Sequence, residues 1–396
     1  MKDKMHRWII LAACFLIMAV AFSIVNSVHS LFIDTVTKER GFSLSSFSLI
    51  FTIAGITTGI VSPFIGRLIR KTNIKLVMAL GSIIGGLGFA AYGLISALPG
   101  FYILAVLISI GITALTTIPI STLINYWFKE QRGMALGIAF AGIGTGSFFW
   151  MQIASYLIEK AGYRWAYIIL GGAIVVITLP LILIFIKLPM EKMERVAAKN
   201  ESSPIKGSSF MNLSFIAFSV GLFLLGIAVA GTKVHAQPYL ISVGYTIQKS
   251  ANIGSLQAIF ALVGNAIGGI VFDKLSLRKS VTIFTLLSVI SYISLLLIGI
   301  PYISVLYALC FGLFMCMPSV LPSYGASALF KGENYSEKIG VVNMVFTLGS
   351  AFGSFLSGFI ADIRGYSFAW FIYIIISLSY LVLFFITFRK KANIEY

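Results

Sequence analysis

The chain alternates between long stretches that carry almost no charge and short connections that carry most of it. A helix needs about 20 apolar residues to cross a bilayer. Twelve stretches are suited to this role, and they cover residues 8–33, 46–66, 76–97, 100–127, 134–158, 165–186, 212–237, 250–272, 280–299, 302–329, 339–361 and 367–388. The pattern therefore predicts an all-α integral membrane protein with twelve transmembrane helices.

One polar stretch is much longer than the other connections and divides the spans into two groups of six. It covers residues 188–211 and is rich in Lys, Glu and Ser. We expect an N-terminal six-helix bundle at 1–187, a cytoplasmic linker at 188–211 and a C-terminal six-helix bundle at 212–396. Duplicated bundles of this kind are typical of transporters.

The two groups of spans also resemble each other in sequence. Gly162-Tyr-Arg-Trp-Ala reappears as Gly365-Tyr-Ser-Phe-Ala. The spacing from Gly162 to Gly365 is called the repeat offset. The segment 141–148 reappears loosely as 348–355, at a slightly larger offset. A basic turn follows the second span of each group. Three matches in the same order indicate a 6+6 duplication with two pseudo-symmetric bundles.

Composition agrees with a membrane protein and narrows the function. Hydrophobic residues make up 59% of the chain and charged residues 11%, whereas soluble domains have about 45–50% and about 25%. The 29 Lys and Arg that give the net charge of +16 gather mostly in one set of connections. By the positive-inside rule this places both termini in the cytoplasm. The basic excess therefore reports orientation in the cell membrane and contact with lipid, and we expect no nucleic-acid partner.

Several chemistries find no support in the sequence. The three cysteines, Cys14, Cys310 and Cys316, lie in apolar segments without metal-ligand spacing, so we expect buried thiols, no metal and no cofactor. No Ser/His/Asp set, paired carboxylates or nucleotide-binding loop is evident. We therefore expect neither an enzyme nor an ATP-driven pump. We also expect the protein to be a monomer.

The basic turns, the 6+6 layout and the long central loop resemble the major facilitator superfamily over the whole chain. The resemblance implies two pseudo-symmetric bundles that expose a central site to one side at a time. It also implies that side chains of the basic turns, with their carboxylate partners, gate the cytoplasmic end. The residues expected to do so are Arg67, Arg70, Lys71, Arg132, Asp273, Lys274 and Arg278. Charges that only set the topology are the alternative interpretation.

A more specific stretch runs from Asn125 to Gly146, at the junction of the fourth and fifth spans. It is similar to the corresponding segment of the monocarboxylate transporter and oxalate/formate antiporter group. That similarity implies secondary transport of small organic anions, by symport or antiport. Physically, small residues let a helix approach a neighbour closely, and we expect this of Gly133, Gly137, Gly142, Gly144 and Gly146.

The sequence departs from that group in the eighth span. Members that carry carboxylates usually have an Arg there, and alignment places Asn265 at its position. No charge occurs between Gly340 and Ile360 in the eleventh span either, where some members have a Lys. The usual carboxylate site is therefore incomplete. An exporter of drugs or of amphipathic or zwitterionic metabolites is the alternative function.

Ionisable residues are costly inside a bilayer and are often functional there. Lys233 and His235 lie in the seventh span, and the first span carries His29 between Asn26 and Ser30. Asn26 and Ser30 are four residues apart and would share one face of a regular helix. Because His titrates near neutral pH, we hypothesise that His29 or His235 carries the coupling proton while Lys233 attracts an anionic substrate. A snorkelling lysine and hydrogen-bonded histidines are the alternative.

Uncharged polar side chains on other spans complete the predicted cavity lining, with interhelical hydrogen bonding as the alternative. The candidates are Asn125, Gln257, Asn265, Tyr324 and Asn343. The sequence thus predicts a secondary active transporter that moves a small organic anion or monocarboxylate-like metabolite by alternating access, coupled to protons.

Overall fold

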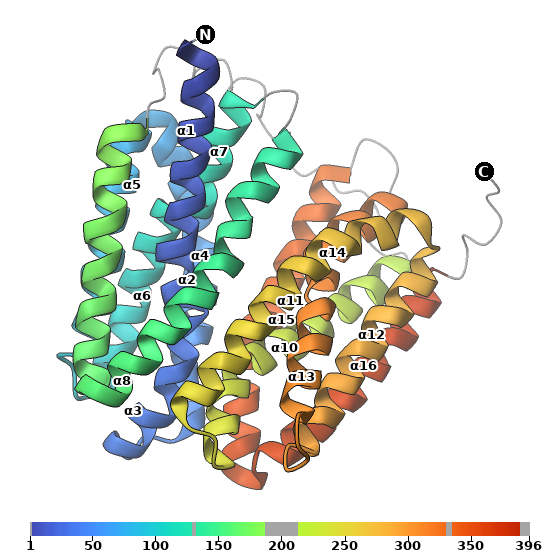
Figure 1. The fold of residues 1–396 in the computed structure, drawn as a ribbon. Coiled ribbons are helices and arrows are strands. Elements are labelled where there is room, and N and C mark those ends of the chain that lie inside the picture. Colours follow the sequence, from blue (N-terminus) through green and yellow to red (C-terminus); the bar gives the residue numbers. More distant parts are fainter. Residues whose placement is uncertain (1, 129–131, 187–212, 330–334, 389–396) are drawn as a thin grey trace. The chain divides into compact units, whose positions relative to one another are not determined.

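The computed structural model describes residues 2–128, 132–186, 213–329 and 335–388, and its regular elements there are helices (Figure 1). Eleven helical segments of these ranges are long and apolar enough to cross a membrane. One of them, Met134–Phe185, has 52 residues and is two helices joined at Gly162. The described residues therefore contain twelve helices of spanning length, as predicted.

The helices of the first half begin with the irregular first span. They are α1 (Lys2–Ile17), η1 (Met18–Phe22), α2 (Ser23–Asn26), η2 (Val28–Leu31), α3 (Phe32–Arg40), α4 (Leu44–Lys71), α5 (Ile74–Ala91), α6 (Leu98–Leu115), α7 (Thr117–Trp127) and α8 (Arg132–Phe185). Those of the second half are α10 (Leu213–Ser242), α11 (Ile247–Lys274), α12 (Leu277–Leu296), α13 (Ile303–Phe314), α14 (Cys316–Leu329), α15 (Tyr335–Arg364) and α16 (Tyr366–Thr387).

Local sequence signals explain where several helices start and stop. The Asn73 side chain accepts a hydrogen bond of 2.9 Å from the backbone N–H of Lys75 and so caps the start of α5. Gly41 follows α3 in the left-handed conformation, with φ 68°, which lets the chain leave the helix without a Cβ clash.

The first span is not a regular α-helix. It widens to a π-helix at Met18–Phe22 and tightens to a 3₁₀-helix at Val28–Leu31, with a break at Ser27. A sequence of apolar residues cannot reveal such changes of helical pitch. Because of them, residues four apart no longer lie above one another.

The internal duplication extends to the backbone. Gly162 has φ 80° and ψ 162°, and its counterpart Gly365 has φ 78° and ψ 166°. This region of conformational space is almost restricted to glycine. The helices α4 and α11 begin at Leu44 and Ile247, which are also separated by the repeat offset. The repeated glycine therefore makes the same sharp turn between the last two spans of each half.

Glycines also bring the fifth span of each half against the first span of that half. A Cβ on Gly142 or Gly146 of α8 would overlap the backbone of Phe15 or Ala19. In α15, Gly349 and Gly353 approach the backbone of α10 in the same way, at Phe223 and Ile227. The close approach predicted for the fifth span is therefore confirmed at Gly142 and Gly146. It is wrong for Gly137, which faces open space.

The chain forms two compact units, and each contains a short segment from the other half of the sequence. The first consists of the described residues within Met1–Phe42, Ile53–Ser202 and Leu240–Ser255. The second consists of those within Ser43–Thr52, Ser203–Tyr239 and Leu256–Tyr396. The predicted linker, 188–211, lies outside the described residues, and the predicted domain boundaries stay a prediction.

Candidate functional site

His235 is the centre of a buried polar cluster in the second unit. Its Nε2 lies 3.0 Å from the backbone oxygen of Ser354 and 2.9 Å from Oγ of Ser48, and its Nδ1 lies 3.1 Å from the hydroxyl of Tyr366. The imidazole has no exposed surface. The cluster joins α4, through Ser48, to α10, α15 and the start of α16.

The partners of His235 determine how its protons are arranged. A carbonyl oxygen can only accept, so the contact with Ser354 assigns a proton to Nε2. In the neutral ring Nδ1 then accepts from the Tyr366 hydroxyl. A second proton on Nδ1 would reverse that hydrogen bond, because a hydroxyl can also accept. The geometry is therefore compatible with both charge states of the ring.

His29 occupies a different environment, in the core of the first unit. It is 3% exposed and lies in η2. Four aromatic rings surround it, with centroid distances of 5.3 Å to Tyr92, 5.5 Å to Phe89, 5.7 Å to Tyr167 and 6.2 Å to Phe32. These contacts favour packing of the imidazole among rings.

The other predicted residues of the first and seventh spans are divided between surface and core. Lys233 of α10 is partly buried. Asn26 is exposed and donates to the backbone oxygen of Phe22 over 3.2 Å, whereas Ser30 is buried and donates to that of Ser27 over 3.0 Å. The prediction that Asn26 and Ser30 share one face is wrong, because the 3₁₀ turn at Val28–Leu31 rotates one relative to the other.

The predicted amide and tyrosine residues also differ in exposure. Gln257 of α11 is partly buried and accepts a hydrogen bond of 3.3 Å from the Tyr307 hydroxyl, while Asn265 of the same helix is exposed. Asn343 of α15 is exposed. Tyr324 of α14 is partly buried beside the ring of Phe272. The side chain of Asn125 lies outside the described part of the structure.

The residues predicted to gate the cytoplasmic end lie mostly at the surface. Exposed positions are Arg67, Lys71, Asp273 and Lys274. Arg67 lies over the ring of Phe64 at 5.6 Å. Arg278 is partly buried and donates through Nε to the backbone oxygen of Phe388 over 3.1 Å. The side chains of Arg70 and Arg132 are not among those described.

A second polar cluster, in the first unit, links α8 to the start of α11. The Gln152 amide donates to Ser255 over 2.9 Å, and Ser155 donates to the Gln248 side chain over 2.8 Å. Gln248 also donates from its side chain to Gln152, and from its backbone N–H to Glu159 over 3.0 Å. These contacts form a ladder of amides, hydroxyls and one carboxylate.

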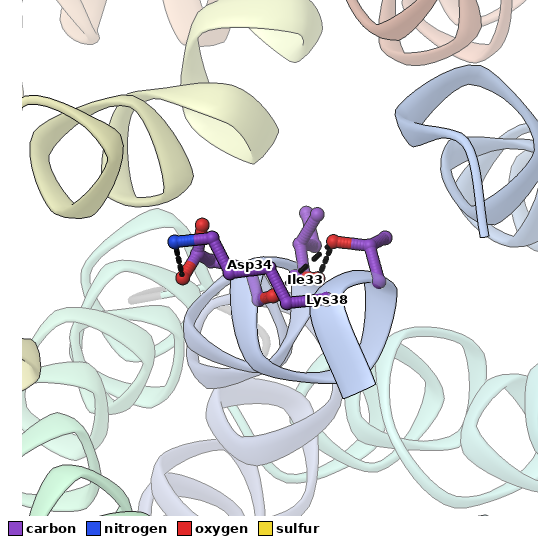
Figure 2. A network of polar contacts seen from close by, with 4 residues as sticks. Ile33, Asp34 and Lys38 are labelled. Atoms are coloured by element: carbon purple, nitrogen blue, oxygen red, sulfur yellow. Dashed lines mark hydrogen bonds and ion pairs between the residues drawn. The ribbon is translucent and has the colours of Figure 1, made fainter. Parts of the chain in front are cut away.

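The end of α3 carries an ion pair of ordinary helical spacing. Lys38 Nζ lies 3.0 Å from the Asp34 carboxylate, four residues earlier, as Figure 2 shows. Lys38 is 67% exposed, so the pair contributes little stability. Thr37, between them in sequence, donates to the backbone oxygen of Ile33 over 2.7 Å. The Asp34 carboxylate therefore forms its ion pair within its own helix.

Sequence reasoning missed most residues of these clusters, among them Ser48, Tyr366 and Glu159, and it also missed Asp362, whose carboxylate accepts the backbone N–H groups of Leu44 and Ser45. The repeat contained a signal for Glu159 and Asp362, because each stands three residues before the repeated glycine. Extending the match upstream by one helical turn would have paired them. Within the described residues, no group of three or more His, Cys, Asp and Glu is placed to hold a metal ion.

Comparison with known proteins identifies the family. The family model described as Major Facilitator Superfamily matches residues 11–328 and 242–395. Monocarboxylate transporter 13 of Rattus norvegicus is 24% identical over 370 residues, covering 90% of this chain and 83% of that protein. The oxalate:formate antiporter of Oxalobacter formigenes is 25% identical over 273 residues, covering 66% of this chain and 64% of that protein.

Solved structures agree on the fold. The nucleoside transporter NupG has a TM-score of 0.78 at 15% identity and covers 98% of this chain and 100% of its own. The relatives are membrane transporters rather than enzymes, and the resemblance expected from the basic turns and the segment from Asn125 to Gly146 is confirmed. This multi-pass membrane protein, with a family match that covers nearly its whole length, belongs to the major facilitator superfamily of transporters.

Proposed function

We propose that the protein is a secondary active transporter that moves a small organic anion, such as a monocarboxylate, across the cytoplasmic membrane by alternating access coupled to protons. The names of the relatives support this substrate class. The observation that carries the proposal is His235, a titratable side chain buried among hydroxyl and carbonyl groups. A buried ionisable group in a transporter marks a substrate or proton site by default.

In the proposed mechanism, His235 takes up a proton at Nδ1 and Tyr366 changes from donor to acceptor. Lys233, two residues away on α10, attracts the anionic group of the substrate. His29 is the second candidate proton site, and its imidazole lies among the rings of Tyr92, Phe89, Tyr167 and Phe32.

We further propose that the protein works as a monomer with both termini in the cytoplasm, as the distribution of basic residues favours. The gate at the cytoplasmic end then includes Arg67, Lys71, Asp273, Lys274 and Arg278. Thiol labelling of single cysteines in the basic turns of intact cells tests this orientation. Labelling by a membrane-impermeant reagent from outside would contradict it.

Uptake by proteoliposomes tests the function. Radiolabelled lactate, pyruvate and oxalate are offered with and without an inward proton gradient, using the parent protein, His235→Ala, His29→Ala and Lys233→Ala. His6→Ala is the matched control, since His6 is the third histidine of the chain. We expect gradient-driven uptake that His235→Ala uncouples and His6→Ala leaves unchanged. Unchanged pH dependence in both the His235 and His29 variants would refute the proton site.

A second candidate function is export of drugs or of amphipathic or zwitterionic metabolites. Asn265 favours it, because this uncharged residue stands where the resemblance to the monocarboxylate transporter group implies an Arg. Cells that express the protein would then accumulate less of a hydrophobic cation than control cells, and the three carboxylates would show no uptake.

A further inference from the structure

Two carboxylates at equivalent positions of the duplication bind the starts of two equivalent helices. In the first unit, Glu159 of α8 accepts the backbone N–H of Gln248, at the start of α11, over 3.0 Å. In the second unit, Asp362 of α15 accepts those of Leu44 and Ser45, at the start of α4, over 2.9 and 2.8 Å. Glu159 and Asp362 are separated by the repeat offset, and so are Ser45 and Gln248.

A second pair of hydrogen bonds follows the same offset. Thr52 of α4 donates to the backbone oxygen of Ala351, and Ser255 of α11 donates to that of Phe148 over 3.0 Å. The repeat offset separates Thr52 from Ser255, and it also separates Phe148 from Ala351. Two independent contacts in each unit thus follow the same symmetry, which excludes a chance placement of one exposed carboxylate.

The chemistry of these contacts gives the carboxylates a defined role. The first N–H groups of a helix have no partner within the helix, and its start carries a partial positive charge. A carboxylate accepts hydrogen bonds from these N–H groups and balances the partial positive charge. Water can replace it easily, because Glu159 and Asp362 are exposed. Such a contact is specific but weak enough to open repeatedly.

Each contact also joins the two halves of the sequence. Glu159 belongs to the first half and Gln248 to the second, whereas Asp362 belongs to the second half and Ser45 to the first. Alternating access requires the halves of a duplicated transporter to move against each other. Each contact lies within one compact unit, but its two partners come from different halves of the sequence, so a motion of one half against the other would separate them.

We propose that Glu159 and Asp362 are a matched pair of gating residues, here named the carboxylate caps, which hold the starts of α11 and α4 in the state seen here. Both caps release together when the transporter passes to its other state. The inference rests on the alternating access of the proposed function, and it requires neither the substrate nor the coupling ion to be known.

Paired spin labels measure the state of each cap in the full-length protein in nanodiscs without substrate. One pair replaces Lys160 and Lys249, which flank the first cap. The other pair replaces Ile363 and Ser46, at the equivalent positions of the repeat. The native cysteines are buried, so labels attach to the introduced sites. Dipolar electron paramagnetic resonance gives the fraction of molecules in which each pair is separated.

Glu159→Gln and Asp362→Asn remove the charge and keep the size of the side chain and an acceptor oxygen. For an exposed carboxylate at a helix start we expect about a threefold increase in the separated fraction from either change, and about tenfold from both. Glu159→Asp and Asp362→Glu retain the charge and should keep most of the parent behaviour. Glu39→Gln, at an exposed carboxylate of α3, is the control.

The decisive observation is which label pair responds. If the caps gate one transition, Glu159→Gln alone widens both pairs. Widening of the near pair only would show a local helix cap and overturn the proposal, as would distributions equal to those of Glu39→Gln. The label measurement contains no substrate, so it is independent of the uptake assay. If carboxylate uptake fails but both label pairs still respond together, the proposed substrate is rejected and the proposed role of the caps is kept.

Discussion

Replacing Gly146 with alanine tests the close contact between α8 and the irregular first span. A Cβ at this position would overlap the carbonyl group and Cα of Ala19. These are backbone atoms, so rotation of a side chain cannot relieve the overlap and the helices must move apart. Overpacking of this kind costs about 1–3 kcal/mol.

Gly137 provides the control on the same helix, because a Cβ there would meet no atom within 4 Å. Alanine is a better helix former than glycine, by about 0.5–1 kcal/mol. Gly137→Ala should therefore stabilise the protein slightly. Gly146→Ala has the same gain in helix propensity, but its overlap should lower the free energy of unfolding by a net amount of about 1–2 kcal/mol. Gly353→Ala, in the equivalent contact of α15 with Ile227, should behave like Gly146→Ala.

The measurement is thermal unfolding of purified protein in detergent, followed by loss of the monodisperse elution peak. Because membrane proteins unfold irreversibly in such assays, the variants are compared at one heating rate. The thermal midpoint should be highest for Gly137→Ala, intermediate for the parent protein and lowest for Gly146→Ala. Equal midpoints for the two variants would refute the close approach.

Further predictions concern the turns, the histidine cluster and the surface ion pair. Gly162→Ala and Gly365→Ala should each destabilise by about 1–3 kcal/mol, since both force a Cβ into a conformation reserved for glycine; equal thermal midpoints with the parent would contradict this. Tyr366→Phe should remove the partner of Nδ1 on His235 and shift the pH profile of uptake, and an unchanged profile would separate Tyr366 from coupling. Lys38→Ala should lower the free energy of unfolding by less than about 0.5 kcal/mol, because exposed ion pairs contribute little. A larger loss of stability would show that the ion pair with Asp34 matters to the fold.

Much of the fold could be predicted because apolar length and repetition are local properties of the sequence. The twelve spans follow from hydrophobic stretches, and the recurrence of the Gly162 segment at Gly365 indicated the duplication. The break at Ser27 could not be predicted, since π and 3₁₀ segments have no distinct composition in an apolar helix. This is why Asn26 and Ser30 were wrongly placed on one face.

The candidate site was less accessible to prediction, because its contacts join residues that are far apart in the chain. His235 stood out as a rare ionisable residue in an apolar span. Its partners Ser48 and Tyr366 did not, because serine and tyrosine are common and nothing local shows which of them will meet a histidine. The roles of Lys233 and of the residues in the basic turns stay predictions.

The two carboxylate caps differ in one respect that their symmetry conceals, namely the order in which the ribosome supplies their parts. Glu159 precedes Gln248 by 89 residues, so that cap can close as soon as α11 starts to form. Leu44 must wait for Asp362, 318 residues later. At about 5–20 residues per second this is a delay of roughly 15–60 s. During synthesis the start of α4 therefore depends on water or on the insertion machinery for its hydrogen bonds, and the second unit is completed last.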